Sequence, residues 1–122
     1  MKHILVIDDV STNLKCVGMI LRNQYQVTML KSGEEALNYL NSHIPDLILL
    51  DIRMQGMNGY EVMEHLKRSP ATAQIPVILI TADSAKESKE KGIALGAADF
   101  IGKPFEPQLL LDRIEAVWKE EE

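Results

Sequence analysis

The stretch that decides the fold is Ile4–Asp9, which reads ILVIDD: an unbroken aliphatic run followed directly by two carboxylates. Two more runs have the same design, LILLD at Leu47–Asp51 and VILIT at Val77–Thr81. Unbroken aliphatic runs of this length are typical of strands that are covered on both faces, as in a parallel sheet. Weaker runs at Gln26–Leu30 and Ala97–Ile101 predict a second and a fifth strand.

Apolar residues three and four positions apart predict helices between these runs. The predicted helices lie at residues 11–22, 32 to about 40, 59–67, 84–95 and 107–119. Ser11 or Thr12 is expected to cap the first helix, and Ser32 with Glu35 indicates a capping box at the second. The fourth is polar and contains glycine, so it is expected to be weak and mobile. Strands that alternate with helices in this way predict a doubly wound α/β fold with right-handed crossovers.

Length and composition narrow the class of protein. A chain of 122 residues fits one domain over residues 1–122, and 46% hydrophobic with 25% charged residues is an ordinary globular balance. The formal net charge is −5, and no basic stripe favours direct binding of nucleic acid. No apolar run approaches the ~20 residues of a membrane span, and the first residues lack a signal-peptide pattern. A single cysteine excludes an internal disulfide, and the cytoplasm is the expected location.

Polar residues stand where the buried runs end. Asp8 and Asp9 follow the first strand, Asp51 ends the third, Thr81 ends the fourth, and Lys103 lies beyond the fifth. In an open α/β sheet, ligands bind beyond the carboxyl ends of the strands, which lie along one edge. Each residue alone has an ordinary explanation: a helix cap for one aspartate of the pair, a turn, a strand-end hydroxyl or a solvated lysine. Their common placement favours one shared site.

The residue types indicate the chemistry of that site. Carboxylates roughly 4 Å apart repel by about 4 kcal/mol at an effective dielectric of 20, so the cluster calls for a hard divalent cation. Lys103 adds a second cation, and Thr81 adds a hydroxyl that suits a tetrahedral anion. An aspartate can act as a nucleophile and form an acyl phosphate, and phosphoryl transfer depends on positioning and charge neutralisation. The pattern therefore predicts phosphoryl transfer onto Asp51.

At these residues the chain resembles the receiver domains of two-component response regulators, of the chemotaxis-regulator type, over its whole length. The likeness rests on the acidic pair, the segment Leu49–Met54, the turn Met57–Gly59, Thr81 with Ala82, and Lys103–Phe105. The resemblance implies a flavodoxin-like three-layer sandwich with strand order 2-1-3-4-5. It also implies a signalling domain, with Mg²⁺ as cofactor, that takes a phosphoryl group from a sensor histidine kinase or a histidine phosphotransfer protein. Such a domain catalyses only its own phosphorylation and slow dephosphorylation.

The resemblance also implies the metal ligands. Asp9 and Asp51 would bind Mg²⁺ directly, and Asp8 would act largely through water. The third protein ligand would be the backbone carbonyl of Arg53. Gln55 stands where the family usually has proline, so the loop after Asp51 is expected to be less constrained.

The switch residues follow from the same resemblance. Lys103 would contact the phosphoryl group, and the bond before Pro104 would be cis, which proline tolerates. The Thr81 hydroxyl would move to a phosphoryl oxygen while Phe100 swings inward, although plain core packing explains Phe100 equally well. The added charge of about −1.5 to −2 would bias the weak fourth helix.

Three further positions bear on the comparison with the family pattern. Asn58 replaces the commoner aspartate of the turn, which should matter little because both residues suit turns. Arg53 and Asp83 lie two residues beyond Asp51 and Thr81. In the family that the chain resembles, these positions flank the path of water to the phosphate. We hypothesise that they form an ion pair at the site mouth that slows hydrolysis; two independent solvated charges are the alternative.

Other classes of protein share parts of this pattern. A flavin-binding flavodoxin needs a phosphate-cradling loop and aromatic residues around the ring, whereas this chain has acids after its first strand and 5% aromatic residues. A phosphatase of the haloacid-dehalogenase class needs a second acid two residues after its nucleophile, where Arg53 stands. A degenerate receiver that only binds partners stays open as an alternative, but nothing in the sequence supports it, because all the site residues are present.

The output remains open at this stage. These residues contain no effector sequence, so the domain either acts alone or is the N-terminal part of a longer protein. The fourth helix, fifth strand and fifth helix are expected to dock an output partner or a second copy of the chain. Neither membrane nor nucleic acid is expected as a direct partner.

Overall fold

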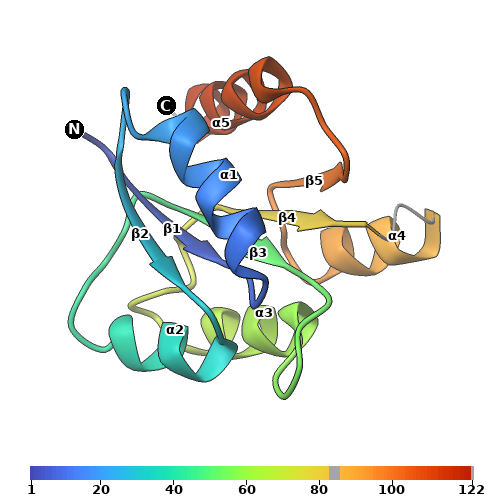
Figure 1. The fold of residues 1–122 in the computed structure, drawn as a ribbon. Helices are drawn as coiled ribbons and strands as arrows, with labels where there is room; N and C mark the ends of the chain where they lie inside the picture. The colour runs from blue at the N-terminus through green and yellow to red at the C-terminus, as the bar shows by residue number, and fades with distance from the viewer. Residues whose placement is uncertain (83–85, 122) are drawn as a thin grey trace.

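The computed structural model describes residues 1–82 and 86–121, in which five parallel strands alternate with five helices (Figure 1). The strands are β1 (His3–Ile7), β2 (Gln26–Leu30), β3 (Leu47–Asp51), β4 (Val77–Thr81) and β5 (Asp99–Gly102). The helices are α1 (Ser11–Leu21), α2 (Gly33–Tyr39), α3 (Gly59–Arg68), α4 (Lys86–Ala94) and α5 (Pro107–Glu121). The strand order β2-β1-β3-β4-β5 confirms the predicted doubly wound α/β fold.

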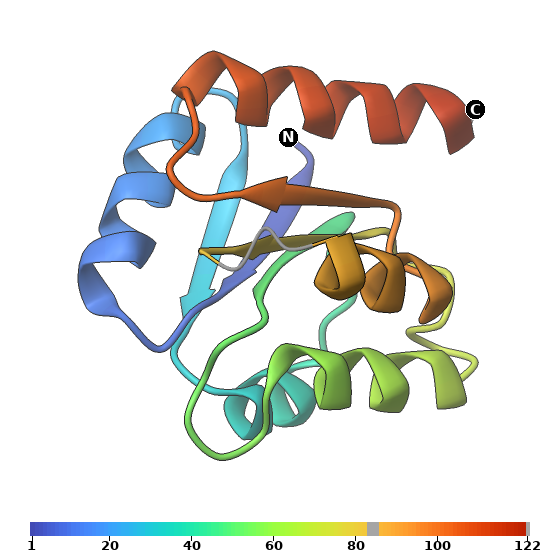
Figure 2. The same cartoon turned by 90° about the vertical axis from the view of Figure 1, so that its right-hand side faces the viewer.

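The aliphatic runs fill two cores because successive strand residues face opposite sides of the sheet. Leu50 belongs to the core formed with α2 and α3, and its neighbour Leu49 belongs to the core formed with α1 and α5. Gly92 of α4 lies against Leu79 on the first of these sides. Helices α1 and α5 therefore cover one face of the sheet, and α2, α3 and α4 cover the other (Figure 2).

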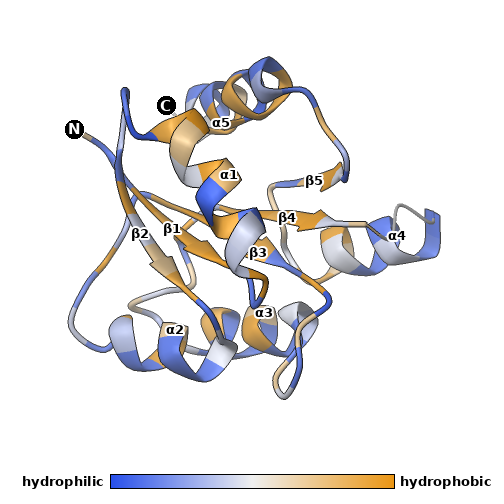
Figure 3. Cartoon of the chain, viewed as in Figure 1, coloured by the Kyte–Doolittle hydropathy of each residue, from blue (hydrophilic) through white to orange (hydrophobic). Residues whose placement is uncertain are grey.

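Hydropathy separates the centre of the molecule from its surface. The strands form an apolar centre, while α4 is mostly hydrophilic (Figure 3). In the described part of the chain, no helix combines the length and the apolar character needed to cross a membrane.

Side chains cap the starts of α2 and α3. Ser32 accepts a hydrogen bond from the Glu35 N–H at 3.1 Å, as predicted, but the Glu35 carboxylate accepts from the Lys31 N–H rather than closing a capping box. At α3 the box is complete, because Asn58 and Glu61 each accept the main-chain N–H of the other. Asn58 thus defines where α3 begins.

The start of α1 differs from the prediction. Val10 occupies the N-cap position and no side chain caps the helix, so the expectation that Ser11 or Thr12 is the cap is wrong. The reason lies one step earlier in the chain: Asp8 Oδ1 accepts the Val10 N–H at 2.9 Å, and the turn that this bond closes makes Ser11 already helical.

The fifth strand begins later than its apolar run. Ala97 donates its N–H to the Gly92 carbonyl at 3.1 Å and so closes the end of α4, which leaves β5 to begin at Asp99. The predicted start of the fourth helix, Ser84, lies outside the described residues; the described helix begins at Lys86.

The sheet register brings the strand ends to one edge. Ile7 of β1 pairs with Leu50 of β3, and Asp51 of β3 pairs with Ile80 of β4. Helix α3 starts close to this edge, because a Cβ on Gly59 would lie 2.5 Å from the Asp51 carbonyl oxygen. β1 and β3 also flank the point where the strand order reverses, which is where open α/β sheets bind ligands.

Candidate functional site

Three carboxylates meet beyond the carboxyl ends of β1 and β3. Asp8 and Asp51 are buried, and Asp9 is partly exposed. Oxygen atoms from the three residues all lie within 4.8 Å of one another. An all-oxygen donor set with one side open to solvent fits a small, hard cation such as Mg²⁺, which keeps several waters. The structure thus brings together the acidic residues that the strand ends indicate.

Lys103 lies between the two buried carboxylates. Its Nζ is 3.0 Å from Asp8 Oδ2 and 3.3 Å from Asp51 Oδ2. The main chain holds the lysine there, since its N–H donates to the Thr81 carbonyl at 2.8 Å. The peptide bond from Lys103 to Pro104 is cis, as the resemblance implied. A single ammonium group therefore offsets part of the repulsion between Asp8 and Asp51.

The Asp51 carboxylate occupies an electrostatically unfavourable place. Burial and the neighbouring Asp8 charge raise its pKa. Lys103 and the Arg53 N–H, which donates to Asp51 Oδ1 at 3.2 Å, oppose that rise without cancelling it. A raised pKa means that the surroundings disfavour the anion, so a cation that neutralises the Asp51 charge is favoured there.

The loop between β3 and α3 is tied to two distant elements. The Gln55 N–H donates to Asp9 Oδ2 at 3.0 Å, and the Met57 N–H donates to Glu34 Oε1, in the first turn of α2, at 3.3 Å. The loop is therefore held at two points, although Gln55 in place of proline predicted a less constrained loop. Sequence reasoning missed both ties, because any residue except proline carries an N–H; the non-proline residue at position 55 was the one available signal.

The predicted switch residues lie toward β4 and β5. Thr81 is fully buried and follows Ile80, the partner of Asp51 in the sheet. Phe100 is also buried, in the core that contains Leu79. In this structure the Phe100 ring is already inside the protein.

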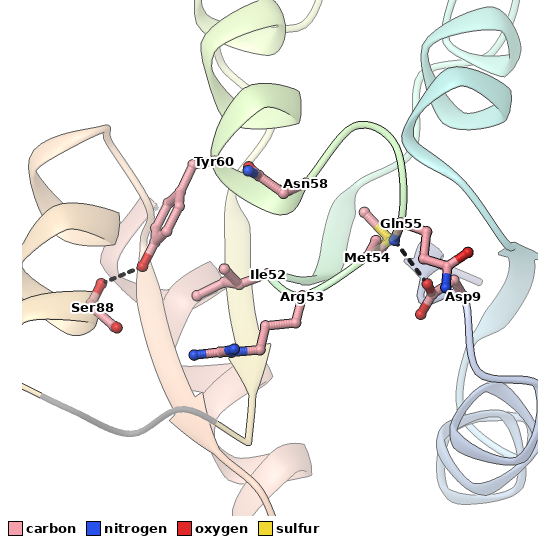
Figure 4. A pocket seen from close by; sticks show the side chains of 8 residues that line it. All are labelled: Asp9, Ile52, Arg53, Met54, Gln55, Asn58, Tyr60 and Ser88. Carbon is pink, nitrogen blue, oxygen red and sulfur yellow. Dashed lines mark hydrogen bonds between the residues drawn. The ribbon is translucent and has the colours of Figure 1, made fainter.

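A groove of about 490 Å³ opens beside the carboxylates (Figure 4). Its lining residues are Asp9, Ile52, Arg53, Met54, Gln55, Asn58, Tyr60 and Ser88. The Tyr60 hydroxyl donates to the Ser88 carbonyl of α4 at 3.0 Å and so joins α3 to α4 (Figure 4). The Arg53 side chain extends toward the α4 side of this groove (Figure 4). Asp83, its predicted partner, lies outside the described residues.

The fold and the site agree with what comparison with known proteins finds. Residues 4–115 match the family described as response regulator receiver domain. The chain is a response-regulator receiver domain. Receiver domains are phosphorylated on an aspartate in two-component signalling, and they work with histidine kinases or phosphotransfer proteins and with output domains. The family assignment decides against the flavin-binding and dehalogenase-type alternatives.

Named regulators resemble this receiver in sequence. It is 39% identical over 119 residues to the phosphate regulon transcriptional regulatory protein PhoB of Escherichia coli. The matched region covers 97% of this chain and 52% of PhoB. It is 36% identical over 116 residues to the response regulator PleD of Caulobacter vibrioides, covering 94% of this chain and 26% of PleD. The receiver thus spans about half the length of PhoB and about a quarter of the length of PleD.

Solved structures resemble it in fold. The chemotaxis response regulator CheY4 of Vibrio cholerae has a TM-score of 0.90 and 29% identity, over 96% of this chain and 98% of that one. The BeF3-activated DrrB receiver domain has a TM-score of 0.88 and 33% identity, over 98% of both chains. DrrB is described as a Thermotoga maritima homologue of OmpR and PhoB.

Proposed function

We propose that this receiver takes a phosphoryl group onto Asp51 from the phosphohistidine of a sensor histidine kinase or a histidine phosphotransfer protein. The observation that carries the proposal is the position of Lys103 Nζ, 3.0 Å from Asp8 and 3.3 Å from Asp51, within a cluster of carboxylates. Asp51 is the member of that cluster at the end of the central strand β3, with a raised pKa.

In the proposed reaction an Asp51 oxygen attacks phosphorus and a P–O bond forms. The P–N bond of the donor breaks, and its electron pair leaves with the imidazole. The Arg53 N–H and Lys103 Nζ contact the two oxygens of Asp51 and so orient the nucleophile before the donor arrives. Lys103 would then neutralise one oxygen of the transferred group, and the Thr81 hydroxyl would donate to another.

Asp9, Asp51 and the Arg53 carbonyl are proposed to hold Mg²⁺, with Asp8 acting largely through water. When bound, the ion supplies charge neutralisation for the carboxylates and for the phosphoryl oxygens. Support for this assignment comes from the oxygen-only chemistry of the cluster and from the partial exposure of Asp9.

The signal is proposed to leave through the face made by α4, β5 and α5, toward an output partner, an effector domain or a second copy of the chain. Thr81 and Phe100 would couple the phosphoryl group to that face, because Thr81 ends β4 and Phe100, on the neighbouring β5, lies against Gly92 of α4. The domain is proposed to act in the cytoplasm, as a single receiver over residues 1–122. It would catalyse only its own phosphorylation and slow dephosphorylation.

Intact-mass spectrometry tests the acceptor. Incubation with acetyl phosphate and Mg²⁺ should add one phosphoryl group to the wild type, and omission of Mg²⁺ or the change Asp51→Asn should abolish the gain. Asp112→Asn is the matched control, because Asp112 is an exposed aspartate on α5 whose carboxylate contacts Gln108. No gain by folded wild-type protein would contradict the proposal and favour a receiver that signals by binding alone.

The site-mouth hypothesis has its own test. Arg53 and Asp83 are proposed to slow hydrolysis of the acyl phosphate, so Arg53→Ala should shorten its lifetime. An unchanged lifetime would leave the two residues as independent solvated charges.

A further inference from the structure

Asp9 is held differently from the other carboxylates of the site. Asp8 and Asp51 both contact Lys103, whereas the Asp9 carboxylate accepts one hydrogen bond within the described chain, from the main-chain N–H of Gln55 to Oδ2 at 3.0 Å (Figure 4). Asp9 is also the most exposed of the three. Its orientation therefore depends on the loop between β3 and α3.

That loop presents the Gln55 N–H from a defined position. At its base the Gly59 N–H donates to the Ile52 carbonyl at 2.8 Å, and further along the Met57 N–H donates to Glu34 at 3.3 Å. Gly56 follows Gln55 with a φ of 75°, a left-handed conformation that glycine adopts without strain. A donor held in this way can orient a carboxylate across a gap of 46 positions in the sequence.

The bond has a consequence for a bound cation. A carboxylate that binds a metal is usually hydrogen-bonded by an outer group, and loss of that group typically costs about 10–100-fold in metal affinity. With Asp9 Oδ2 engaged by Gln55, Oδ1 is left for a cation. The same N–H joins Asp9 to the loop that carries the Arg53 carbonyl, so it links two of the proposed ligands.

We propose that the main-chain N–H of Gln55 is a positioning group for the metal site, an inference that rests on the proposed Mg²⁺ site. Mg²⁺ affinity depends on the N–H at position 55 and not on the glutamine side chain. Proline has no N–H, so a chain with the family's usual proline at this position cannot make the bond. This receiver orients Asp9 by a contact between two loops.

Mg²⁺ titration followed by NMR of the backbone amides tests the proposal with two variants of one residue. Gln55→Pro removes the N–H and should weaken Mg²⁺ binding by about tenfold or more, whereas Gln55→Ala keeps the N–H and should stay within about twofold of wild type. With acetyl phosphate, Gln55→Pro should shift the Mg²⁺ midpoint of phosphorylation and leave the rate at saturating Mg²⁺ close to that of wild type. Equal affinities of Gln55→Pro and wild type, or equal losses in both variants, would overturn the proposal.

A measurement without metal separates the hydrogen bond from any strain that proline introduces. Hydrogen exchange of the Gln55 amide should accelerate by about tenfold in Asp9→Ala, while the Met57 amide, bonded to Glu34, should keep its rate. An unchanged Gln55 rate would overturn the inference alone. A wild type that binds no Mg²⁺ would instead overturn the proposed metal site, and this inference with it.

Discussion

Helices α3 and α4 lie on the same face of the sheet and flank the same groove, yet the protein holds them very differently. α3 buries Val62, Met63 and Leu66 and begins with a complete capping box. α4 buries Gly92 alone in its described length, and its outward residues are mostly hydrophilic (Figure 3). The groove beside the acidic site is therefore lined by a helix anchored in the core and by one that buries little of its own surface.

Polar contacts join α4 to α3 in the described part of the chain. The Tyr60 hydroxyl donates to the Ser88 carbonyl at 3.0 Å, and Lys91 Nζ lies 4.4 Å from the centre of the Tyr60 ring. Elements with few buried apolar contacts are those that move at low free-energy cost, and a charge change beside such an element can shift its position. The proposed phosphoryl group at Asp51 is therefore expected to displace α4 more than α3.

The largest expected effect tests the anchored helix. Leu66→Ala should lower the free energy of unfolding by about 2–5 kcal/mol, because it leaves a cavity in the core under α3. Ile93→Ala is the control on α4: Ile93 is 45% exposed, so its loss should stay within about 0.5 kcal/mol. Urea unfolding of both variants measures the two losses in stability, and equal losses would show that α4 is anchored as firmly as α3.

The next effect tests how closely α4 approaches the sheet. Gly92→Ala should cost about 1–3 kcal/mol, because a Cβ at this position would lie 2.5 Å from Leu79 Cδ1. Gly18→Ala in α1 is a matched control, since its Cβ would meet the flexible end of Met29 at 3.2 Å and helix propensity favours alanine by about 1 kcal/mol. Equal stabilities of the two variants in urea would show that α4 can move away from β4 without cost.

A smaller effect should be confined to α4. Tyr60→Phe removes the hydrogen bond to Ser88, worth about 0.5–1.5 kcal/mol, and keeps the aromatic ring. Hydrogen exchange should accelerate in α4 and stay unchanged in α3. Tyr25→Phe serves as the control, because no hydrogen bond of the Tyr25 hydroxyl is found in the described chain. Faster exchange throughout the protein would contradict a local role.

Unlike the substitutions above, Asp51→Asn is expected to raise the stability of the protein. The raised pKa of Asp51 means that its ionised form lowers stability, so the native state loses stability relative to Asp51→Asn as pH rises through that pKa. Without Mg²⁺, Asp51→Asn should therefore melt at a higher temperature than wild type at neutral pH, and the difference should shrink toward the ordinary carboxyl pKa of about 3.9. Thermal melts over this range check it; a lower melting temperature of Asp51→Asn at neutral pH would contradict the electrostatic account.

The strand ends made the candidate site accessible to sequence reasoning. The site residues follow the aliphatic runs directly or closely: Asp8, Asp9, Asp51 and Lys103. Because parallel strands place their carboxyl ends along one edge, a shared site follows from the topology. The contacts between residues do not follow in the same way. The bond from Gln55 to Asp9 joins residues 46 positions apart through a main-chain donor that leaves no mark on residue identity.

The sequence alone determined the sheet, its coverage on both faces and the residues that meet at its edge. Buried strands require unbroken aliphatic runs, and helices packed on one side require apolar residues at helical spacing, so both are visible in the sequence. The tertiary structure alone decided where α1 begins, how the loop after β3 is held and what joins α3 to α4. The last two depend on hydrogen bonds between residues far apart in the sequence, from the Gln55 N–H to Asp9 and from the Tyr60 hydroxyl to the Ser88 carbonyl. The start of α1 depends on a short-range bond from the Val10 N–H to Asp8. One partner in each bond is a main-chain group that nearly every residue carries, so residue identity alone does not specify the bond.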